Sequence, residues 1–419
     1  MKKINNYINK NLNNILKILI IIGPILDLLV SLSINVFHHS LNIGIIIRML
    51  TLVFIYYVSV VIYKKKKNLI YVFLALVYGI IFLIVQYDNT IISNLHGFMR
   101  TFYFPLLLLG LYSIKEKIDI KDSTLVITVF IYIILIFIAV ITGTGFESYK
   151  IAKVGSLGWF NSTNEISGIV SILLPILFIY LSKGKKYILK TILSLIFAYV
   201  IVEIGTKTPV LSLLITLFMT FIYIFIKIIK KKNYLLLSGV IIFSVIALTS
   251  LVILVPKTNF YKNIKIHTKY LKITNIKQVL TNEYVFDHFI FSQRITFYDK
   301  TDTRYEKMKV SKKLFGMGYY TKKAKPYKEI EMDYYDVLYN HGIIGFIVYF
   351  SIYFYILFKV FKNLPKKLNY EYLMKYLSLV LILILSLFSG HIITTPAVSI
   401  YVVIIIIDLI NIKNSKVKV

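Results

Sequence analysis

Apolar stretches of about twenty residues alternate with short basic or polar connections along most of the chain. A helix needs about 20 apolar residues to cross roughly 30 Å of hydrocarbon. We predict twelve transmembrane helices, at residues 15–36, 43–63, 69–86, 100–114, 123–142, 164–182, 187–204, 209–227, 234–255, 341–361, 376–394 and 397–412. The last two are separated only by TTP at 394–396. The pattern therefore predicts an all-α polytopic membrane protein.

Basic residues gather in the connections and give the chain a formal net charge of +30. Examples are KKKK at 64–67, KIIKKK at 227–232 and KNLPKK at 362–367. Cytoplasmic loops are enriched in Lys and Arg, so we place these runs and both termini in the cytoplasm. We attribute the charge to topology and to contacts with membrane lipids, and expect no nucleic-acid partner.

Three parts follow from this topology. Residues 1–255 hold helices one to nine, and residues 341–419 hold helices ten to twelve with a cytoplasmic tail. Residues 256–340 form one large extracytoplasmic loop, the only connection long enough to fold as a small subdomain.

Three carboxylates, Glu331, Asp333 and Asp336, precede the tenth predicted span. If the helix begins near residue 333, Asp333, Asp336 and Asn340 share one of its faces, while Glu331 points elsewhere. A carboxylate beside an apolar boundary is suited to act as a general base. The alternative is structural, since acids at the start of a helix interact favourably with its dipole.

Four cations, Arg48, Arg100, Lys207 and Arg294, are expected near the outer ends of the spans or in the large loop. Together they suit a pyrophosphate, whose growing negative charge they would stabilise as it leaves. Three of them also have a simpler interpretation: a buried ion pair of Arg48 with Asp27, a contact of Lys207 with the membrane surface or with Glu203, or a solvated Arg294.

No metal or other cofactor is predicted. The chain has no Cys, and its His residues show no ligand spacing. The D-x-x-D motif at 299–302 offers two carboxylates on a loop, which is weak evidence for a cation site.

Several short motifs also occur in a characteristic order: G-W-F-N-x-x-N-E at 158–165, I-G-T-K-T-P at 204–209, S-x-R at 292–294, L-F-G-M-G-Y at 314–319, D-x-x-D-x-L-x-x-x-G-I-I-G-F at 333–346 and G-H-I-I-T-T-P-A-V-S at 390–399. In this order they resemble the O-antigen ligase/polysaccharide polymerase family (Wzy-type polymerases and lipopolysaccharide ligases). The last motif resembles the Gram-positive, capsule or teichuronic-type branch.

The resemblance implies a GT-C-like helical fold and metal-independent, inverting transfer of a glycan from undecaprenyl pyrophosphate to a sugar hydroxyl. It implies that Arg294 lies near the donor pyrophosphate. Where the family often has Ser-Arg in the hairpin, this chain has Thr206-Lys207, and where ligases commonly carry His it has Glu331, Asp333 and Asp336. We prefer Asp333 or Asp336 as the base.

The predicted function is a polysaccharide polymerase of the bacterial plasma membrane that joins lipid-linked repeat units, with its site facing outside. A flippase and a chain-length regulator are its expected protein partners. A glycan ligase is the nearest alternative. A transporter or flippase is an alternative of another class, but the chain shows no repeat of one half in the other.

Overall fold

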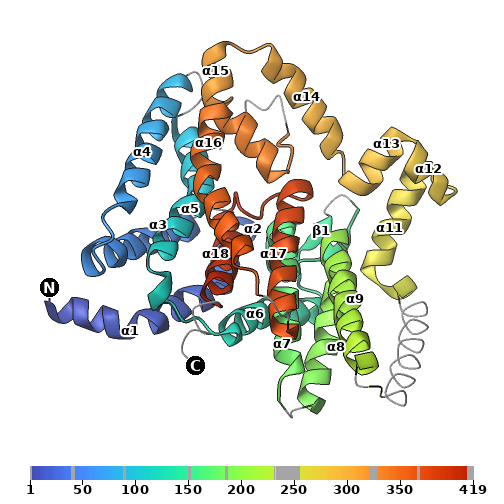
Figure 1. Ribbon diagram of the computed structural model, residues 1–419. Helices are drawn as coiled ribbons and strands as arrows, with labels where there is room; N and C mark the ends of the chain where they lie inside the picture. The colour runs from blue at the N-terminus through green and yellow to red at the C-terminus, as the bar shows by residue number, and fades with distance from the viewer. Residues whose placement is uncertain are drawn as a thin grey trace.

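The computed structural model describes residues 2–38, 43–87, 91–149, 152–184, 187–230, 232, 255–319, 328–365 and 369–412. Within them it is a helical bundle with one short antiparallel hairpin (Figure 1). The first half contains α1 (Lys2–Ile21), α2 (Gly23–Asn35), α3 (Ile43–Tyr56), η1 (Tyr57–Ile62), α4 (Asn68–Val85), α5 (Ile91–Ser113), η2 (Lys115–Lys117), α6 (Asp122–Thr142), β1 (Glu147–Tyr149), β2 (Val154–Ser156), α7 (Thr163–Ser182), α8 (Tyr187–Ile204) and α9 (Lys207–Lys230). The second half contains η3 (Val255–Lys257), α11 (Asn259–Tyr270), α12 (Ile276–Thr281), α13 (Glu283–Phe286), η4 (Asp287–Phe291), α14 (Arg294–Glu306), α15 (Val310–Phe315), α16 (Asp333–Lys362), α17 (Tyr370–Phe388) and α18 (Pro396–Asn411).

Eight helical segments of the described residues are long and apolar enough to cross a membrane, and α18 is a shorter apolar helix. Every predicted span except the ninth coincides with one of these helices or with α5 or α8. The ninth, 234–255, lies almost entirely outside the described residues. The prediction of an all-α polytopic membrane protein is confirmed, whereas the division into three parts stays a prediction.

Helix α7 lies at the centre of the bundle and contacts α6, α9, α17 and α18. Ile169 and Leu173 of α7 are completely buried, as are Val402 and Ile406 of α18. A membrane helix that is apolar on all sides and buried by its neighbours forms a core that excludes lipid. This core holds the starts of α7 and α18 at one end of the bundle.

The boundary between the last two spans differs from its prediction. Helix α17 ends at Phe388 and α18 starts at Pro396, so the break is longer than the predicted TTP. The backbone N–H groups of residues 391–393 donate to the carboxylate of Asp333 instead of continuing a helix. A side chain from another helix therefore replaces the helical hydrogen bonds that hydropathy led us to expect.

The loop before α16 folds into helices α11 to α15. Figure 1 shows α14 and α15 over the end of the bundle and α11 to α13 at its side, beyond α9. Asn263 of α11 donates a hydrogen bond to the carbonyl of Gly205, at 3.0 Å, in the turn between α8 and α9. A small apolar cluster of Met317, Ile330, Met332 and Tyr339 connects the loop to α16.

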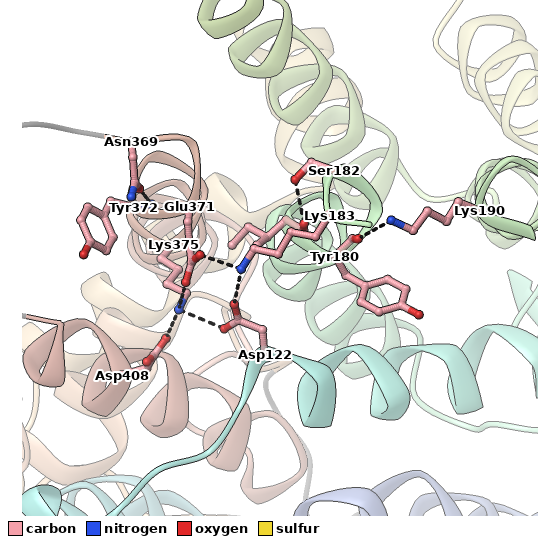
Figure 2. Close-up of polar contacts among 11 residues, drawn as sticks. Asp122, Tyr180, Ser182, Lys183, Lys190, Asn369, Glu371, Tyr372, Lys375 and Asp408 are labelled. Carbon is pink, nitrogen blue, oxygen red and sulfur yellow. Dashed lines mark hydrogen bonds and ion pairs between the residues drawn. The ribbon is translucent and has the colours of Figure 1, made fainter. Parts of the chain in front are cut away.

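An ionic cluster ties helices together at the opposite end of the bundle (Figure 2). Lys375 Nζ lies 3.0 Å from Asp122, 3.1 Å from Glu371 and 2.8 Å from Asp408. Lys183 Nζ lies 2.6 Å from Glu371. The cluster joins the start of α6, the end of α7, the start of α17 and the end of α18.

Candidate functional site

The segment that carries Arg294 has an unusual backbone. Ser292 and Gln293 both adopt positive φ, 54° and 71°, directly before α14. The carboxylate of Asp287 accepts hydrogen bonds from the backbone N–H groups of Ile295 (2.9 Å) and Thr296 (3.0 Å). Two left-handed non-glycine residues in succession are costly, and such strain persists where the surrounding structure fixes it, often at functional sites.

Arg294 is buried and makes four hydrogen bonds through its guanidinium. Nε donates to the Glu331 carbonyl (3.0 Å), Nη1 to the Phe291 carbonyl (3.2 Å), and Nη2 to both the Glu331 carboxylate (3.1 Å) and the Ser389 carbonyl (3.2 Å). The planar guanidinium thereby links the segment before α14, the segment before α16 and the end of α17.

Glu331 has a positive φ of 64° and lies two residues before α16. Its Oε2 also accepts a hydrogen bond from Asn164 Nδ2 (3.2 Å), and its Oε1 lies 3.6 Å from Lys328 Nζ. Gly390 passes so close that a Cβ there would come within 2.3 Å of the Glu331 carbonyl oxygen. The position of Glu331 is thus fixed from several sides, although its backbone conformation is unfavourable.

A polar cavity of about 500 Å³ opens beside this pair. Its lining includes Lys207, Arg294, Lys328 and Glu331, with hydroxyl and amide groups of the chain around Asn164. The starts of α7, α9 and α14 all contribute to it. Helix N-termini carry unsatisfied N–H groups and partial positive charge, so the cavity is suited to an anion.

A second, smaller cavity of about 250 Å³ adjoins the first. Asp336, Tyr339 and Asn340 line it from α16, and Tyr319 lines it from the L-F-G-M-G-Y turn. Lys328 and Glu331 line both cavities. The carboxylate of Asp336 accepts a hydrogen bond from the backbone N–H of Ile330 at 3.1 Å. Glu331 therefore lies at the boundary between the larger polar cavity and a smaller one lined by a further carboxylate.

Asp333 takes a different place from Asp336. It is completely buried and accepts hydrogen bonds of 2.6–2.9 Å from the backbone N–H groups of residues 391–393 and from the hydroxyl of Thr394. It lines neither of these two cavities. Asp336 and Asn340, which their spacing places on one helix face, both line the smaller cavity, whereas Asp333 is directed at the segment before α18. Glu331, expected to point elsewhere, lines both cavities.

The predicted cations are also separated. Arg48 forms a salt bridge with Asp27, whose other oxygen accepts a hydrogen bond from the Tyr132 hydroxyl at 2.5 Å, in agreement with the ion-pair alternative. Arg100 lies 3.8 Å from Glu329 at the smaller cavity. Neither arginine lines the two cavities.

Lys207 lines the larger cavity beside Arg294. Its Nζ donates to the Phe289 carbonyl and lies 4.5 Å from the centre of that ring. The lysine is therefore held by the chain just before Arg294, which brings both cations to one wall.

Sequence reasoning missed a buried chain of polar groups behind the smaller cavity. The Tyr319 hydroxyl lies 2.7 Å from Thr101 Oγ1 and 3.0 Å from His341 Nε2, and His341 Nδ1 lies 3.1 Å from the Tyr78 hydroxyl. Burial raises the pKa of Tyr319, so its hydroxyl keeps its proton. The sequence could have revealed this chain of polar groups only through the contact between Tyr319 and His341, and no local spacing indicates that contact.

Asn164 and Lys328 were also missed. Asn164 belongs to the G-W-F-N-x-x-N-E motif, so the motif marked its region. Within the described residues, no group of three or more His, Cys, Asp or Glu side chains is placed to hold a metal ion. Asp302 of the D-x-x-D motif instead accepts a hydrogen bond from the Tyr339 hydroxyl at 2.7 Å.

Comparison with protein families gives one match: the model of O-antigen ligase-like membrane proteins covers residues 9–285 and 274–415. No curated protein and no solved structure matches the chain. The match spans nearly the whole sequence and confirms the resemblance to the family, whereas the Gram-positive branch stays a prediction. It indicates a multi-pass membrane enzyme of glycosyl transfer with lipid-linked glycan substrates. The chain belongs to the O-antigen ligase-like membrane protein family.

Proposed function

We propose that this protein is a polysaccharide polymerase that transfers a glycan from undecaprenyl pyrophosphate to a sugar hydroxyl of another lipid-linked repeat unit. The observation that carries the proposal is the Arg294–Glu331 pair, which stands where the anion-binding cavity meets the smaller carboxylate-lined cavity. A group that stabilises a leaving anion and a group that accepts a proton are thereby adjacent.

The donor pyrophosphate binds in the larger cavity. Lys207 and Arg294 supply positive charge, and the starts of α7 and α9 supply N–H groups. As the bond between the anomeric carbon and the pyrophosphate oxygen breaks, negative charge grows on that oxygen. Cations already fixed in place stabilise it without reorganisation, which lowers the barrier to transfer.

The acceptor sugar enters from the smaller cavity. Its hydroxyl oxygen forms the new bond to the anomeric carbon, on the face opposite the pyrophosphate, and its proton passes to a carboxylate. We assign this role to Glu331, because its carboxylate lines both cavities, with Asp336 as the second candidate. Attack from the opposite face inverts the anomeric configuration, and the step uses no metal ion.

We place the site on the outer face of the bacterial plasma membrane. The basic connection at 115–117 lies at the other end of the bundle, where its carbonyl groups accept hydrogen bonds from Asn13 and Asn411 near the two chain ends. Basic connections favour the cytoplasm, so the cavities face outward. This orientation supports substrates delivered by a flippase, and a chain-length regulator as a second partner.

The deciding experiment is reconstitution in liposomes with a synthetic undecaprenyl-pyrophosphate oligosaccharide. A polymerase produces a ladder of lipid-linked products that lengthen by one repeat unit at a time. A single transfer, to a supplied acceptor that is not itself lipid-pyrophosphate-linked, would identify a ligase instead. Movement of the lipid-linked substrate between leaflets without a new glycosidic bond would identify a transporter and contradict both.

A further inference from the structure

A basic arm lies at the side of the bundle and precedes Arg294 in the sequence. We define the arm as residues 255–284, which comprise η3, α11, α12 and the start of α13. Residues 255–282 contain six lysines and no Asp or Glu: Lys257, Lys262, Lys265, Lys269, Lys272 and Lys277. All six are exposed. With the one acid of the arm, Glu283, six Lys less one Glu give the arm a net charge of +5, and Lys262 also interacts with Glu203 of α8. In α14, by contrast, three basic and three acidic residues cancel.

The arm also exposes large apolar side chains. Tyr270, Ile276 and Leu280 are 74%, 79% and 72% exposed, and Tyr261 and Ile266 are exposed as well. On α11 the exposed side carries two neighbouring rows at helical spacing: Tyr261, Lys265 and Lys269 in one, and Lys262, Ile266 and Tyr270 in the other. Water alone does not favour so many exposed apolar groups on so short a segment.

The arm lies at the level where the spans end. Asn259 donates a hydrogen bond to the Glu203 carboxylate at the end of α8, and Asn263 donates to the carbonyl of Gly205 in the α8–α9 turn. Figure 1 shows α11 to α13 beside α9, at the side of the bundle. These contacts fix α11 next to the end of α8 and the start of α9.

We propose that the arm is an interfacial anchor that inserts its apolar side chains among the lipids of the leaflet facing the site and binds their anionic head groups through its lysines. Exposed Ile, Leu and Tyr beside Lys is the composition of helices that lie in the membrane interface. The long Lys stems cover apolar surface while their ammonium groups reach the head groups.

An acidic glycan is the rival ligand for a row of lysines. An acidic glycan would explain the positive charge, but it would offer no apolar surface to the exposed Ile276 and Leu280. Lipid supplies both an anionic surface and an apolar phase at one depth, so lipid is the occupant that the observations favour.

The arm is connected to the site. It continues through η4, whose Phe289 carbonyl accepts the hydrogen bond of Lys207, and reaches Arg294 three residues after η4 ends at Phe291. A membrane-bound arm would therefore fix one end of the segment that carries Arg294 and binds Lys207 through the Phe289 carbonyl. The anchor itself does not depend on the proposed glycosyl transfer.

The chain contains a single Trp, so replacing it leaves a background in which one introduced Trp reports how deeply its own position lies in the membrane. In a full-length Trp159→Phe background we would place one reporter in the arm, Leu280→Trp, and a matched control at an exposed position of α14, Lys300→Trp. Both variants are reconstituted in liposomes containing phosphatidylcholine brominated near the head of its acyl chains, with and without phosphatidylglycerol. We expect Leu280→Trp to emit at shorter wavelength and to lose most of its fluorescence to the bromines, and Lys300→Trp to be little quenched.

Charge is tested in the same background. Lys265→Gln, Lys269→Gln and Lys272→Gln together should abolish any additional quenching of Leu280→Trp that phosphatidylglycerol produces, and high salt should do the same. Equal quenching of the two reporters would overturn the anchor. If the quenching of Leu280→Trp does not change with lipid charge, the proposed binding of anionic head groups by the lysines is overturned. Shielding from bromines by an added acidic polysaccharide, in place of lipid, would establish the rival ligand.

Discussion

Arg294 binds both the main chain and the side chain of Glu331: its Nε donates to the carbonyl oxygen at 3.0 Å, and its Nη2 donates to the carboxylate at 3.1 Å. The two residues are thus oriented as one unit, although 37 positions separate them in the chain. A bidentate arrangement of this kind depends on the fork of the guanidinium, which lysine does not have.

Replacing Arg294 with Lys should lower the rate of glycan transfer by roughly 10²-fold or more, because a fixed donor at a developing charge contributes that much. Lipid-linked repeat units should accumulate on the outer leaflet, as measured by extraction after labelling of surface-exposed glycans. Lys300→Gln on the exposed side of the same helix is the control and should leave product length unchanged. Normal polymer from Arg294→Lys would refute the donor role.

The two candidate bases are distinguished by Glu331→Gln and Asp336→Asn, which keep shape and remove proton acceptance. If Glu331 is the base, its variant should lose about 10²–10⁴ in turnover. Donor binding, measured with a fluorescent lipid pyrophosphate, should persist. Asp336→Asn should then retain a large part of the turnover. The reverse result would transfer the role to Asp336.

Asp333→Ala should lose activity because the protein is destabilised, and not because a catalytic group is lost. The substitution leaves three buried donors, the N–H groups of Ile392 and Ile393 and the hydroxyl of Thr394, without their acceptor. Each such group costs about 1–3 kcal/mol, so the loss of stability should exceed about 3 kcal/mol. Thermal unfolding in detergent measures it, with the exposed Asp299→Ala as the control. An Asp333→Ala protein that is stable but inactive would instead support a direct role in catalysis.

Gly316→Ala should detach the L-F-G-M-G-Y turn from α16. Gly316 has a φ of 87°, and a Cβ there would lie 2.1 Å from the Asn340 carbonyl oxygen. The neighbouring N–H groups of Met317 and Gly318 donate to Tyr339 and Asn340. We expect a cost of roughly 1–3 kcal/mol from the backbone alone. Gly143→Ala, also at positive φ but in open space, separates backbone strain from the clash and should be the milder change.

Chelation of divalent cations should leave the reconstituted activity unchanged, since the proposed step uses only protein cations and a carboxylate. Activity with excess EDTA, compared with added Mg²⁺ or Mn²⁺, is the measurement. Loss of activity that Mg²⁺ restores would contradict the metal-free step.

Hydropathy alone located nearly every described membrane helix, because the cost of exposing polar groups to hydrocarbon is local to each segment. The site was harder to predict. The i, i+3 spacing of Asp333 and Asp336 suggested a shared face, but backbone donors from residues 391–393 determine where the Asp333 carboxylate points. Glu331 reached the site because its left-handed backbone turns it toward Arg294, and no sequence pattern encodes that conformation.

The ionic cluster around Lys375 occupies the end of the bundle away from the cavities. Helices α7, α17 and α18 each run from that cluster to the site, where Asn164, Ser389 and the Asp333-bound segment hold their other ends. Helices that are held at both ends resist being pushed apart. If a bulky polyprenyl chain is to enter, helices that are less constrained than these three have to move. The entry path should therefore be sought between helices at the periphery of the bundle.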